Sequence, residues 1–231
     1  MSDANPVVIF DCDGTLLDSA AGIVRAMLRA FEALGHPAPP DGAVRGIIGL
    51  SVREAVATLA PTLDAPALDR MVAAYRDAYL AGLAEAEGED ALYPGTLDAL
   101  DALEAAGHVL AVATGKSRRG LDRVIAAHGL EGRFVSLQTA DHHPSKPHPA
   151  MARQAMLEAG GAPHSTVLVG DTGYDMAMAR GAGCFALGVG WGYHDRGRLM
   201  AAGAQALATD RPEIVTHVTQ LLCRGKETSQ A

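Results

Sequence analysis

Asp11 and Asp13 stand immediately after an apolar run at positions 7–10, and a glycine and a threonine follow them. Four consecutive apolar residues are typical of a strand that is covered on both faces, as in parallel sheets. Residues two apart in extended backbone project to the same side, and two such carboxylates repel each other unless they share a cation. This spacing predicts a phosphoryl-transfer site. The alternative is a strand that ends in a polar turn, because Asp-Gly-Thr is ordinary turn chemistry.

Polar side chains also stand at the ends of two later predicted strands and in one loop. Thr114 follows one apolar segment, Asp171 follows another, and Asp175 lies one helical turn further on. Lys146 lies in a loop at the same edge of the predicted sheet as these strand ends. Prolines on both sides of it restrict the backbone. Because ligands of open α/β sheets bind outside the carboxyl ends of the strands, we expect these groups to converge on the first acidic pair. That convergence supports a site more strongly than any single motif.

Each of these residues also has a purely structural interpretation. Thr114 could serve only as a helix cap, and a loop lysine such as Lys146 is more often solvated. Asp171 and Asp175 could be an N-cap and a first-turn acid that the helix dipole favours. Histidines of the same loop could form a metal site, although we interpret them as solvated residues beside the site: His142, His143 and His148.

The predicted strands alternate with helices, which is typical of an α/β fold with a doubly wound parallel sheet. An all-helical stretch interrupts this alternation after the first strand, because its apolar residues recur at helical spacing. We therefore expect a core of residues 1–16 and 94–231 and an inserted helical cap at 17–93 that has no convincing strand. The predicted strands are 7–10, 108–113, 134–137, 166–170 and 184–189, with an acidic linker or helix end at 85–90 and a frayed tail at 224–231.

The composition restricts the classes of partner. The chain has 231 residues and a formal net charge of −8, with lysine only at positions 116, 146 and 226. A nucleic-acid-binding surface normally needs clustered lysine and arginine, so we expect no nucleic-acid partner. The first residues show no basic segment followed by a long apolar run, and no apolar window is long enough to span a membrane, so we expect neither a signal peptide nor membrane association. The three cysteines are widely spaced, which suits reduced thiols and a cytoplasmic location.

Five motifs together carry a resemblance that covers nearly the whole chain. They resemble the haloacid dehalogenase superfamily, specifically its phosphatases with a helical cap after the first strand, and most of all the phosphoglycolate-phosphatase-like members. The motifs are Asp-Cys-Asp-Gly-Thr-Leu-Leu-Asp-Ser at 11–19, Ala-Thr-Gly-Lys at 113–116, Ser-Lys-Pro-His-Pro at 145–149, Gly-Asp-Thr-Gly-Tyr-Asp-Met at 170–176 and Gly-Val-Gly-Trp-Gly-Tyr at 188–193.

This resemblance implies a Mg²⁺-dependent reaction with a covalent intermediate. Asp11 would attack the substrate phosphorus and become an aspartyl phosphate. Asp13 would protonate the leaving alcohol and then deprotonate the water that hydrolyses the intermediate. Mg²⁺ prefers oxygen ligands and keeps several waters, which fits Asp11, the Asp13 carbonyl and Asp171, with Asp175 as a ligand through water or as an orienting residue. The expected substrate is a small phosphate monoester that resembles 2-phosphoglycolate.

The resemblance also assigns residues to substrate binding. Gly14, Thr114, Gly115 and Lys146 would hold the phosphoryl group, since helix N-termini and fixed cations stabilise its charge. Apart from the resemblance, we expect Arg45 in the cap to bind an anionic group such as the carboxylate of 2-phosphoglycolate, because its guanidinium can bind carboxylates bidentately. The alternative for Arg45 is a surface arginine at a helix end.

Several other activities use the same core motifs. Pyrophosphatase, nucleotidase and sugar-phosphate mutase remain open, as does the choice between monomer and homodimer. Dehalogenases of the superfamily generally lack the second acid, which this chain has as Asp13, and the Schiff-base hydrolases need a cap lysine, which residues 17–93 lack. A signalling receiver domain is the hypothesis from another class, and it predicts a stable phosphoprotein without turnover.

Overall fold

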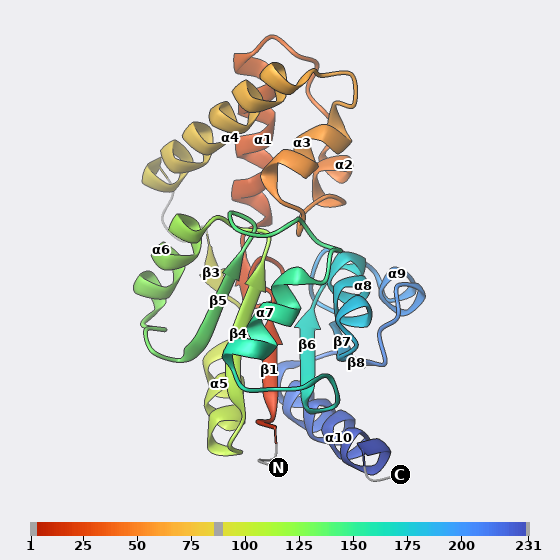
Figure 1. Cartoon of the computed structure of the whole chain (residues 1–231). Coiled ribbons are helices and arrows are strands. Elements are labelled where there is room, and N and C mark those ends of the chain that lie inside the picture. The colour runs from red at the N-terminus through yellow and green to blue at the C-terminus, as the bar shows by residue number, and fades with distance from the viewer. Residues whose placement is uncertain (1–3, 86–89, 230–231) are drawn as a thin grey trace.

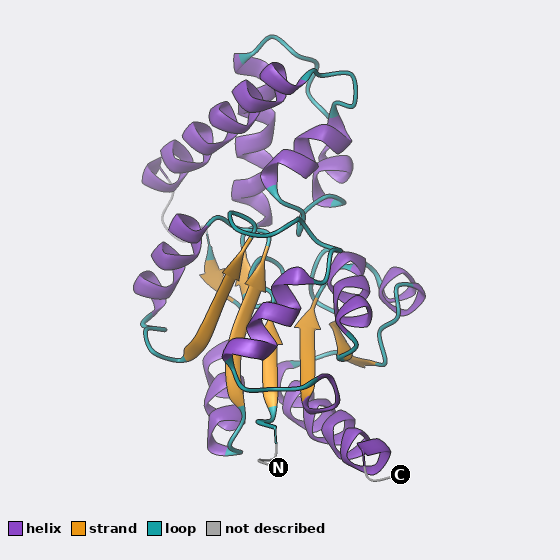
Figure 2. Cartoon of the chain, in the orientation of Figure 1, coloured by secondary structure: helices purple, strands orange, loops and turns teal. Residues whose placement is uncertain are grey.

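A six-stranded parallel sheet forms the centre of the computed structural model, which describes residues 4–85 and 90–229. The strand order is β5-β4-β1-β6-β7-β8, and all neighbouring strands run parallel. Figure 1 and Figure 2 show the sheet below the helical cap. The strands are β1 (Val7–Phe10), β4 (Val109–Thr114), β5 (Phe134–Thr139), β6 (Thr166–Gly170), β7 (Phe185–Val189) and β8 (Ala206–Ala208).

Strand β1 lies in the middle of the sheet and is buried on both faces, as its unbroken apolar run predicts. Its side chains alternate between two separate parts of the core. Val8 and Phe10 pack into a cluster with residues of α5, α6 and α10, whereas Val7 and Ile9 pack into a second cluster with residues of α7, α8 and α9. Helices therefore cover both faces, and the predicted doubly wound parallel sheet is confirmed.

The core helices supply one apolar stripe each to these two clusters. Leu121 of α6 and Val218 of α10 contribute to the first cluster, and Met176 of α8 and Leu199 of α9 contribute to the second. The bounds are α5 (Thr96–Ala105), α6 (Arg118–His128), α7 (Ala150–Glu158), α8 (Gly173–Ala182), α9 (Arg196–Ala201) and α10 (Arg211–Ser229), with a short 3₁₀ helix at Pro163–Ser165.

The cap has its own hydrophobic centre, which is separate from the two clusters of the core. It is formed by helices α1 (Ala20–Ala33), α2 (Asp41–Arg45), α3 (Val52–Leu59) and α4 (Ala65–Glu85). Met27 and Phe31 of α1 pack with Val56 of α3 and Met71 of α4. The predicted helical insertion after the first strand is thus confirmed.

Cap and core are joined by a short antiparallel ribbon that the sequence did not indicate. It pairs β2 (Leu17–Asp18) with β3 (Ala91–Leu92). Strands of two residues are too short to show a period, so the expectation of no strand in the insertion was wrong at both of its ends. The division of the chain at 16/17 and 93/94 falls beside this ribbon and stays a prediction.

Two parts of the chain differ from the sequence expectations. The frayed tail expected from residue 224 was wrong, because α10 continues to Ser229. Helix α9 and strand β8 lie in a region without a predicted element. Of the acidic segment 85–90, residues 86–89 lie outside the described part of the chain. Among the described helices, none is both long and apolar enough to cross a bilayer.

Candidate active site

Three neighbouring strands deliver the predicted polar residues to one edge of the sheet. Asp11 follows β1, Thr114 ends β4, and Asp171 follows β6, and β4 and β6 both pair with β1. All three side chains are buried, with at most 1% of the residue surface exposed. The rule that carboxyl ends of parallel strands share an edge therefore places these residues as the sequence predicted.

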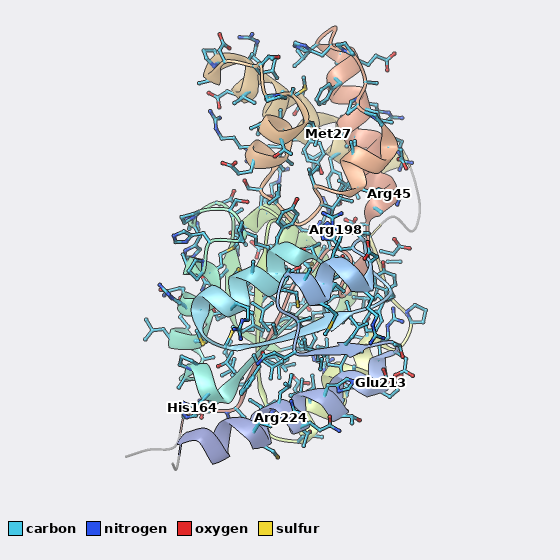
Figure 3. All side chains as sticks on the ribbon, turned by 90° about the vertical axis from the view of Figure 1, so that its right-hand side faces the viewer. Met27, Arg45, His164, Arg198, Glu213 and Arg224 are labelled. Carbon is cyan, nitrogen blue, oxygen red and sulfur yellow. The ribbon has the colours of Figure 1, made fainter. Side chains whose placement is uncertain are left out.

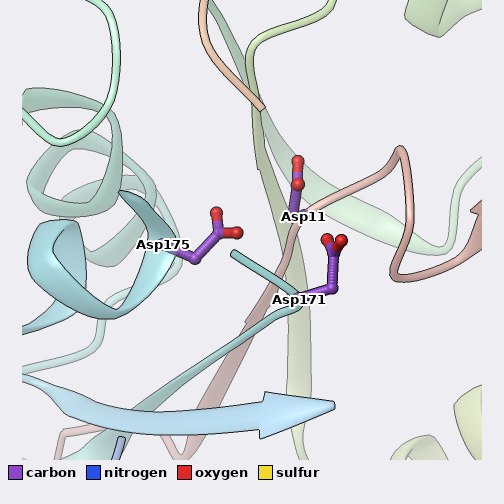
Figure 4. A group of neighbouring side chains, drawn as sticks. All are labelled: Asp11, Asp171 and Asp175. Carbon is purple, nitrogen blue, oxygen red and sulfur yellow. The ribbon is translucent and has the colours of Figure 1, made fainter. Parts of the chain in front are cut away.

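Three carboxylates meet at this edge. One oxygen from each of Asp11, Asp171 and Asp175 lies within 4.8 Å of the others, and Figure 4 shows them on three different segments. Burial raises the pKa of Asp11 to about 7, and the charges of Asp175 and Asp13 add to this rise while Lys146 opposes it. Burial also raises the pKa of Asp171, with the charges of Asp175 and Asp11 contributing. Such a crowded set of buried acids favours a bound cation.

The oxygen atoms present fit a hard divalent cation. Asp11 Oδ2 is buried and has no hydrogen-bond or ion-pair partner among the described residues. Asp171 already accepts from Thr15 Oγ1 (3.0 Å to Oδ1) and from the Tyr193 amide (2.9 Å to Oδ2), which fixes its orientation. Carboxylate oxygens held in this way are the ligands that Mg²⁺ uses in phosphoryl-transfer sites.

Lys146 is the buried cation of the same cluster. Its Nζ lies 2.7 Å from Asp11 Oδ1 and 2.6 Å from Asp175 Oδ1, and none of its side-chain surface is exposed. Burial alone lowers the pKa of this ammonium, but the charges of Asp11 and Asp175 raise it above its usual value overall. The interpretation of Lys146 as a solvated loop lysine is therefore wrong.

Asp175 connects the helix terminus to the charged cluster. Its Oδ2 accepts from the Thr172 amide (3.0 Å) and the Thr172 hydroxyl (2.7 Å), and the Asp175 amide donates back to that hydroxyl. This is a capping box at the start of α8, with Thr172 rather than Asp171 as the N-cap. The first-turn interpretation of Asp175 is correct for Oδ2, and Oδ1 is left to hold Lys146.

Asp13 has a buried partner that the sequence reasoning did not assign. Its Oδ1 accepts from Ser19 Oγ (2.6 Å) and lies 2.9 Å from the ammonium of Lys116. Burial lowers the pKa of Lys116, but the charge of Asp13 raises it well above its usual value overall. Lys116 also reaches the hydroxyl of Tyr79 in cap helix α4 (3.5 Å). The sequence did contain a signal for a functional role of Lys116, because it stands two residues after Thr114 in a chain with three lysines.

Thr114 and Gly115 lie where the cap touches the core. The Thr114 hydroxyl oxygen accepts from the Lys116 amide (3.2 Å), which leaves its proton free for another acceptor. A Cβ on Gly115 would lie 2.5 Å from the Gly49 carbonyl oxygen and 2.7 Å from that of Leu50. Only glycine at this position allows the cap loop to approach so closely. The N-cap of α6 is Ser117 rather than Thr114.

A cavity of about 420 Å³ opens in front of these residues, between core and cap. Asp11, Asp13, Thr114, Gly115 and Lys116 line it from the core, and residues of α1, α3, α4 and the segment 47–50 line it from the cap. The two predicted acids and the apolar side chains of the cap thus line the same cavity.

Comparison with known proteins assigns the family. The family model described as haloacid dehalogenase-like hydrolase matches residues 8–189. This chain belongs to the haloacid dehalogenase-like hydrolase family. The chain is thus a hydrolase, and the resemblance of its five motifs is confirmed.

Relatives in the haloacid dehalogenase-like family cover almost the whole chain. The probable phosphatase IndB of Dickeya dadantii is 37% identical over 94% of this chain and 95% of its own length. A plasmid-encoded phosphoglycolate phosphatase of Cupriavidus necator is 37% identical over 87% of both chains. A haloacid dehalogenase-like family hydrolase from Streptococcus pneumoniae, whose structure is solved, is 27% identical with a TM-score of 0.78 over 92% of this chain and 98% of its own.

Two residues predicted for substrate binding in this haloacid dehalogenase-like protein have other contacts. The Arg45 guanidinium pairs with Asp41 Oδ2 (2.9 Å), 47% of its side chain is exposed, and the described lining of the cavity does not include it. Figure 3 shows Arg45 in the cap, together with Met27. The Gly14 amide donates to the Leu17 carbonyl (2.8 Å), and its φ of +86° with a Cβ position 2.2 Å from Asp171 Oδ2 explains why glycine is required. Substrate contact by either residue stays a prediction.

The cap loop is held on the core by hydrogen bonds that the sequence reasoning missed. His194 accepts from the Gly173 amide at Nδ1 (2.9 Å), so its Nε2 carries the proton and donates to the Gly46 carbonyl (3.2 Å). The Tyr174 hydroxyl donates to the same carbonyl (3.2 Å). The loop histidines are separate from the carboxylate cluster: His142 and His148 are exposed, and His143 pairs with Gln138.

Proposed function

We propose that this hydrolase is a Mg²⁺-dependent phosphatase that cleaves phosphate monoesters through an aspartyl phosphate on Asp11. The observation that carries the proposal is the shared cavity, because a buried Asp11 with an unpartnered oxygen and the second acid Asp13 line the same space. A nucleophilic carboxylate beside a separate acid is what a two-step displacement at phosphorus needs.

In the first step, an Asp11 carboxylate oxygen forms a bond to phosphorus while the bond from phosphorus to the ester oxygen breaks. Asp13 gives its proton to that oxygen, and the alcohol leaves. In the second step, Asp13 takes a proton from a water molecule, whose oxygen attacks the aspartyl phosphate. The bond between phosphorus and Asp11 breaks, inorganic phosphate leaves, and Asp11 returns as a carboxylate.

Fixed positive groups of the chain stabilise the phosphoryl charge. Lys146 is anchored by Asp175, and the Thr114 hydroxyl and Gly115 amide lie at the polar corner of the cavity. Such preorganised donors supply most of the stabilisation in phosphoryl transfer. Asp11, the Asp13 carbonyl and Asp171 would hold Mg²⁺, with Asp175 behind them. A bound Mg²⁺ neutralises charge on the transferring group.

Relatives named phosphoglycolate phosphatase support 2-phosphoglycolate as the first substrate to test. The mutase, nucleotidase and pyrophosphatase alternatives share the core and differ in the cap. A receiver domain stores the phosphoryl group, so it needs neither an acid-base residue that hydrolyses its phosphoaspartate nor a cavity roofed by a second domain. Asp13 and the cap therefore both favour turnover over storage of the phosphoryl group.

The test is the release of phosphate from p-nitrophenyl phosphate by the purified chain. We expect many turnovers per chain with Mg²⁺, loss of activity with EDTA, and loss of activity in Asp11→Asn. Asp98→Asn, an exposed first-turn acid of α5 outside the site, is the matched control and retains activity. A single phosphoryl transfer without turnover would instead support the receiver.

A further inference from the structure

The cavity above Asp11 has walls of two kinds. Its core side is polar, whereas the cap contributes mainly aliphatic and aromatic side chains. We call the apolar part the cap chamber and define it by six buried residues, which are Ile23, Met27, Ile47, Ile48, Ala55 and Tyr75. These residues belong to the hydrophobic centre of the cap, so their positions are set by packing. The chamber is thus a preformed apolar surface that faces the nucleophile.

The size of the cavity exceeds what a phosphoryl group with a glycolate body needs. At roughly 30 Å³ for each water-sized group, 420 Å³ holds on the order of a dozen such groups. Cavities of this size normally bury most of a small organic ligand. A substrate with a two-carbon glycolate body would leave the cap chamber filled with water, and this water would have few polar partners there.

Two tyrosine rings extend the chamber along α4. Tyr75 and Tyr79 stack with their ring centroids 5.9 Å apart and their planes at 20°. The Tyr79 hydroxyl is held by Asp90, with 2.7 Å and 2.9 Å to its two carboxylate oxygens, so the ring is fixed in place. A fixed aromatic wall favours a flat apolar group beside it.

The cations at the inner end of the cavity already have anionic partners. Lys116 pairs with Asp13, and Arg123 pairs with Asp90 at 2.8 Å. Arg76 and Arg119 also line the cavity but are exposed. A substrate carboxylate in the chamber would have to displace Asp13 from Lys116, whereas an apolar body needs no such exchange. Charge therefore disfavours a second anionic group at the inner end of the cavity, whereas Arg76 and Arg119 place cations only at its exposed end.

We infer that the preferred substrate is a phosphate monoester whose alcohol carries an apolar body, aromatic or branched, which the cap chamber encloses. This inference rests on the proposed phosphatase function and names its substrate class. The phosphoryl group lies at Asp11, and the body lies against Ile47, Met27 and the ring of Tyr75. Burial of the body also excludes water from the leaving oxygen, which Asp13 protonates.

The test compares esters that differ only in the body. Ethyl phosphate and 2-phenylethyl phosphate have similar primary-alcohol leaving groups, so kcat/KM reports the chamber alone. We expect kcat/KM for the phenyl ester to be about 10- to 100-fold higher than for ethyl phosphate, which corresponds to burying one aromatic side chain. It should also be higher than kcat/KM for 2-phosphoglycolate. Equal or lower kcat/KM for the phenyl ester would overturn the inference. No phosphate release from any ester would instead overturn the proposed function.

A matched pair of variants on α3 locates the effect. Ala55→Leu fills the chamber, and we expect it to lower the ratio of the two kcat/KM values by about tenfold. Ala57→Leu makes the same change on the same helix outside the described lining, and the ratio stays at the wild-type value. Equal ratios in both variants would place the selecting surface elsewhere. If Ala55→Leu fails to fold, the wild-type ratio decides.

Discussion

The Lys116 ammonium lies 2.9 Å from Asp13 Oδ1, and both side chains are nearly enclosed, with 8% and 11% of their surface exposed. Ser19 donates to the same oxygen, so two donors fix one side of this carboxylate. In the proposed mechanism, Oδ2 is therefore the oxygen that gives and takes the proton. The Lys116–Asp13 pair connects the proposed acid–base residue to the cap, because Lys116 also contacts Tyr79 of α4.

Removing the charge of Lys116 tests this link. We expect Lys116→Met to lower kcat by about 10- to 100-fold, because Asp13 loses a charged donor that orients it. Lys116→Arg keeps a cation and retains part of the activity. Arg118→Met, an exposed change on the same segment, serves as control. An unchanged kcat in Lys116→Met would show that Ser19 alone positions Asp13.

Substitution of Gly115 tests whether the close contact between the cap loop and the core is needed for activity. The Cβ of Gly115→Ala would meet two backbone oxygens of the cap loop, so the loop must move. Displacement of about 1 Å near a reacting group can cost on the order of 100-fold, and we expect a loss of kcat/KM of that size. Gly42→Ala has open space around its Cβ and keeps full activity. Full activity in Gly115→Ala would contradict a catalytic role for this contact.

Metal binding has a thermodynamic readout that does not depend on turnover. Mg²⁺ at a hundred times its Kd should increase the free energy of unfolding by about 2.7 kcal/mol. The thermal unfolding midpoint should rise accordingly. Because the pKa of Asp11 is raised to about 7, protons compete with the cation below that pH, and the shift grows from pH 6 to pH 8. Asp171→Asn loses the shift, whereas Asp98→Asn keeps it. A shift that survives in Asp171→Asn would place the cation elsewhere.

His194 makes the stability of the folded chain depend on pH. Burial lowers the pKa of His194 in the folded chain, so the unfolded chain binds the proton more readily. Stability is therefore present above the unfolded value of about 6.5 and is lost as pH falls below it. Protonation removes the Nδ1 acceptor for Gly173, a loss of up to about 1 kcal/mol. Urea titrations at pH 7 and pH 5 should show a smaller difference in His194→Gln than in wild type; equal differences would contradict this role.

The sheet and the positions of its acids could be predicted from the sequence because they follow from local rules. An apolar run such as Val7–Phe10 predicts a buried parallel strand, and the end of such a strand predicts where Asp11 lies. Helical spacing in the insertion predicted the cap. These features need no knowledge of side-chain directions across the fold.

Features that depend on contacts distant in the chain were missed. The pairing of Lys116 with Asp13 follows from the way β4 lies beside β1, and the ribbon of β2 and β3 is too short for any period. Arg45 is an instructive case, because its partner Asp41 stands four residues earlier on α2, a spacing that favours an ion pair on the helix surface. That local signal for a surface ion pair was present in the sequence, and the substrate role of Arg45 stays a prediction.

Direct detection of a phosphorylated Asp11 tests the central claim. In Asp13→Asn the second step lacks its base, so the intermediate should accumulate when the protein is mixed with p-nitrophenyl phosphate and Mg²⁺ and quenched in acid. Mass spectrometry of the peptide that carries residue 11 should show one added phosphoryl group on Asp11, and Asp11→Asn should show none. Phosphate release without any phosphorylated Asp11, or a phosphoryl group on another residue, would contradict the account.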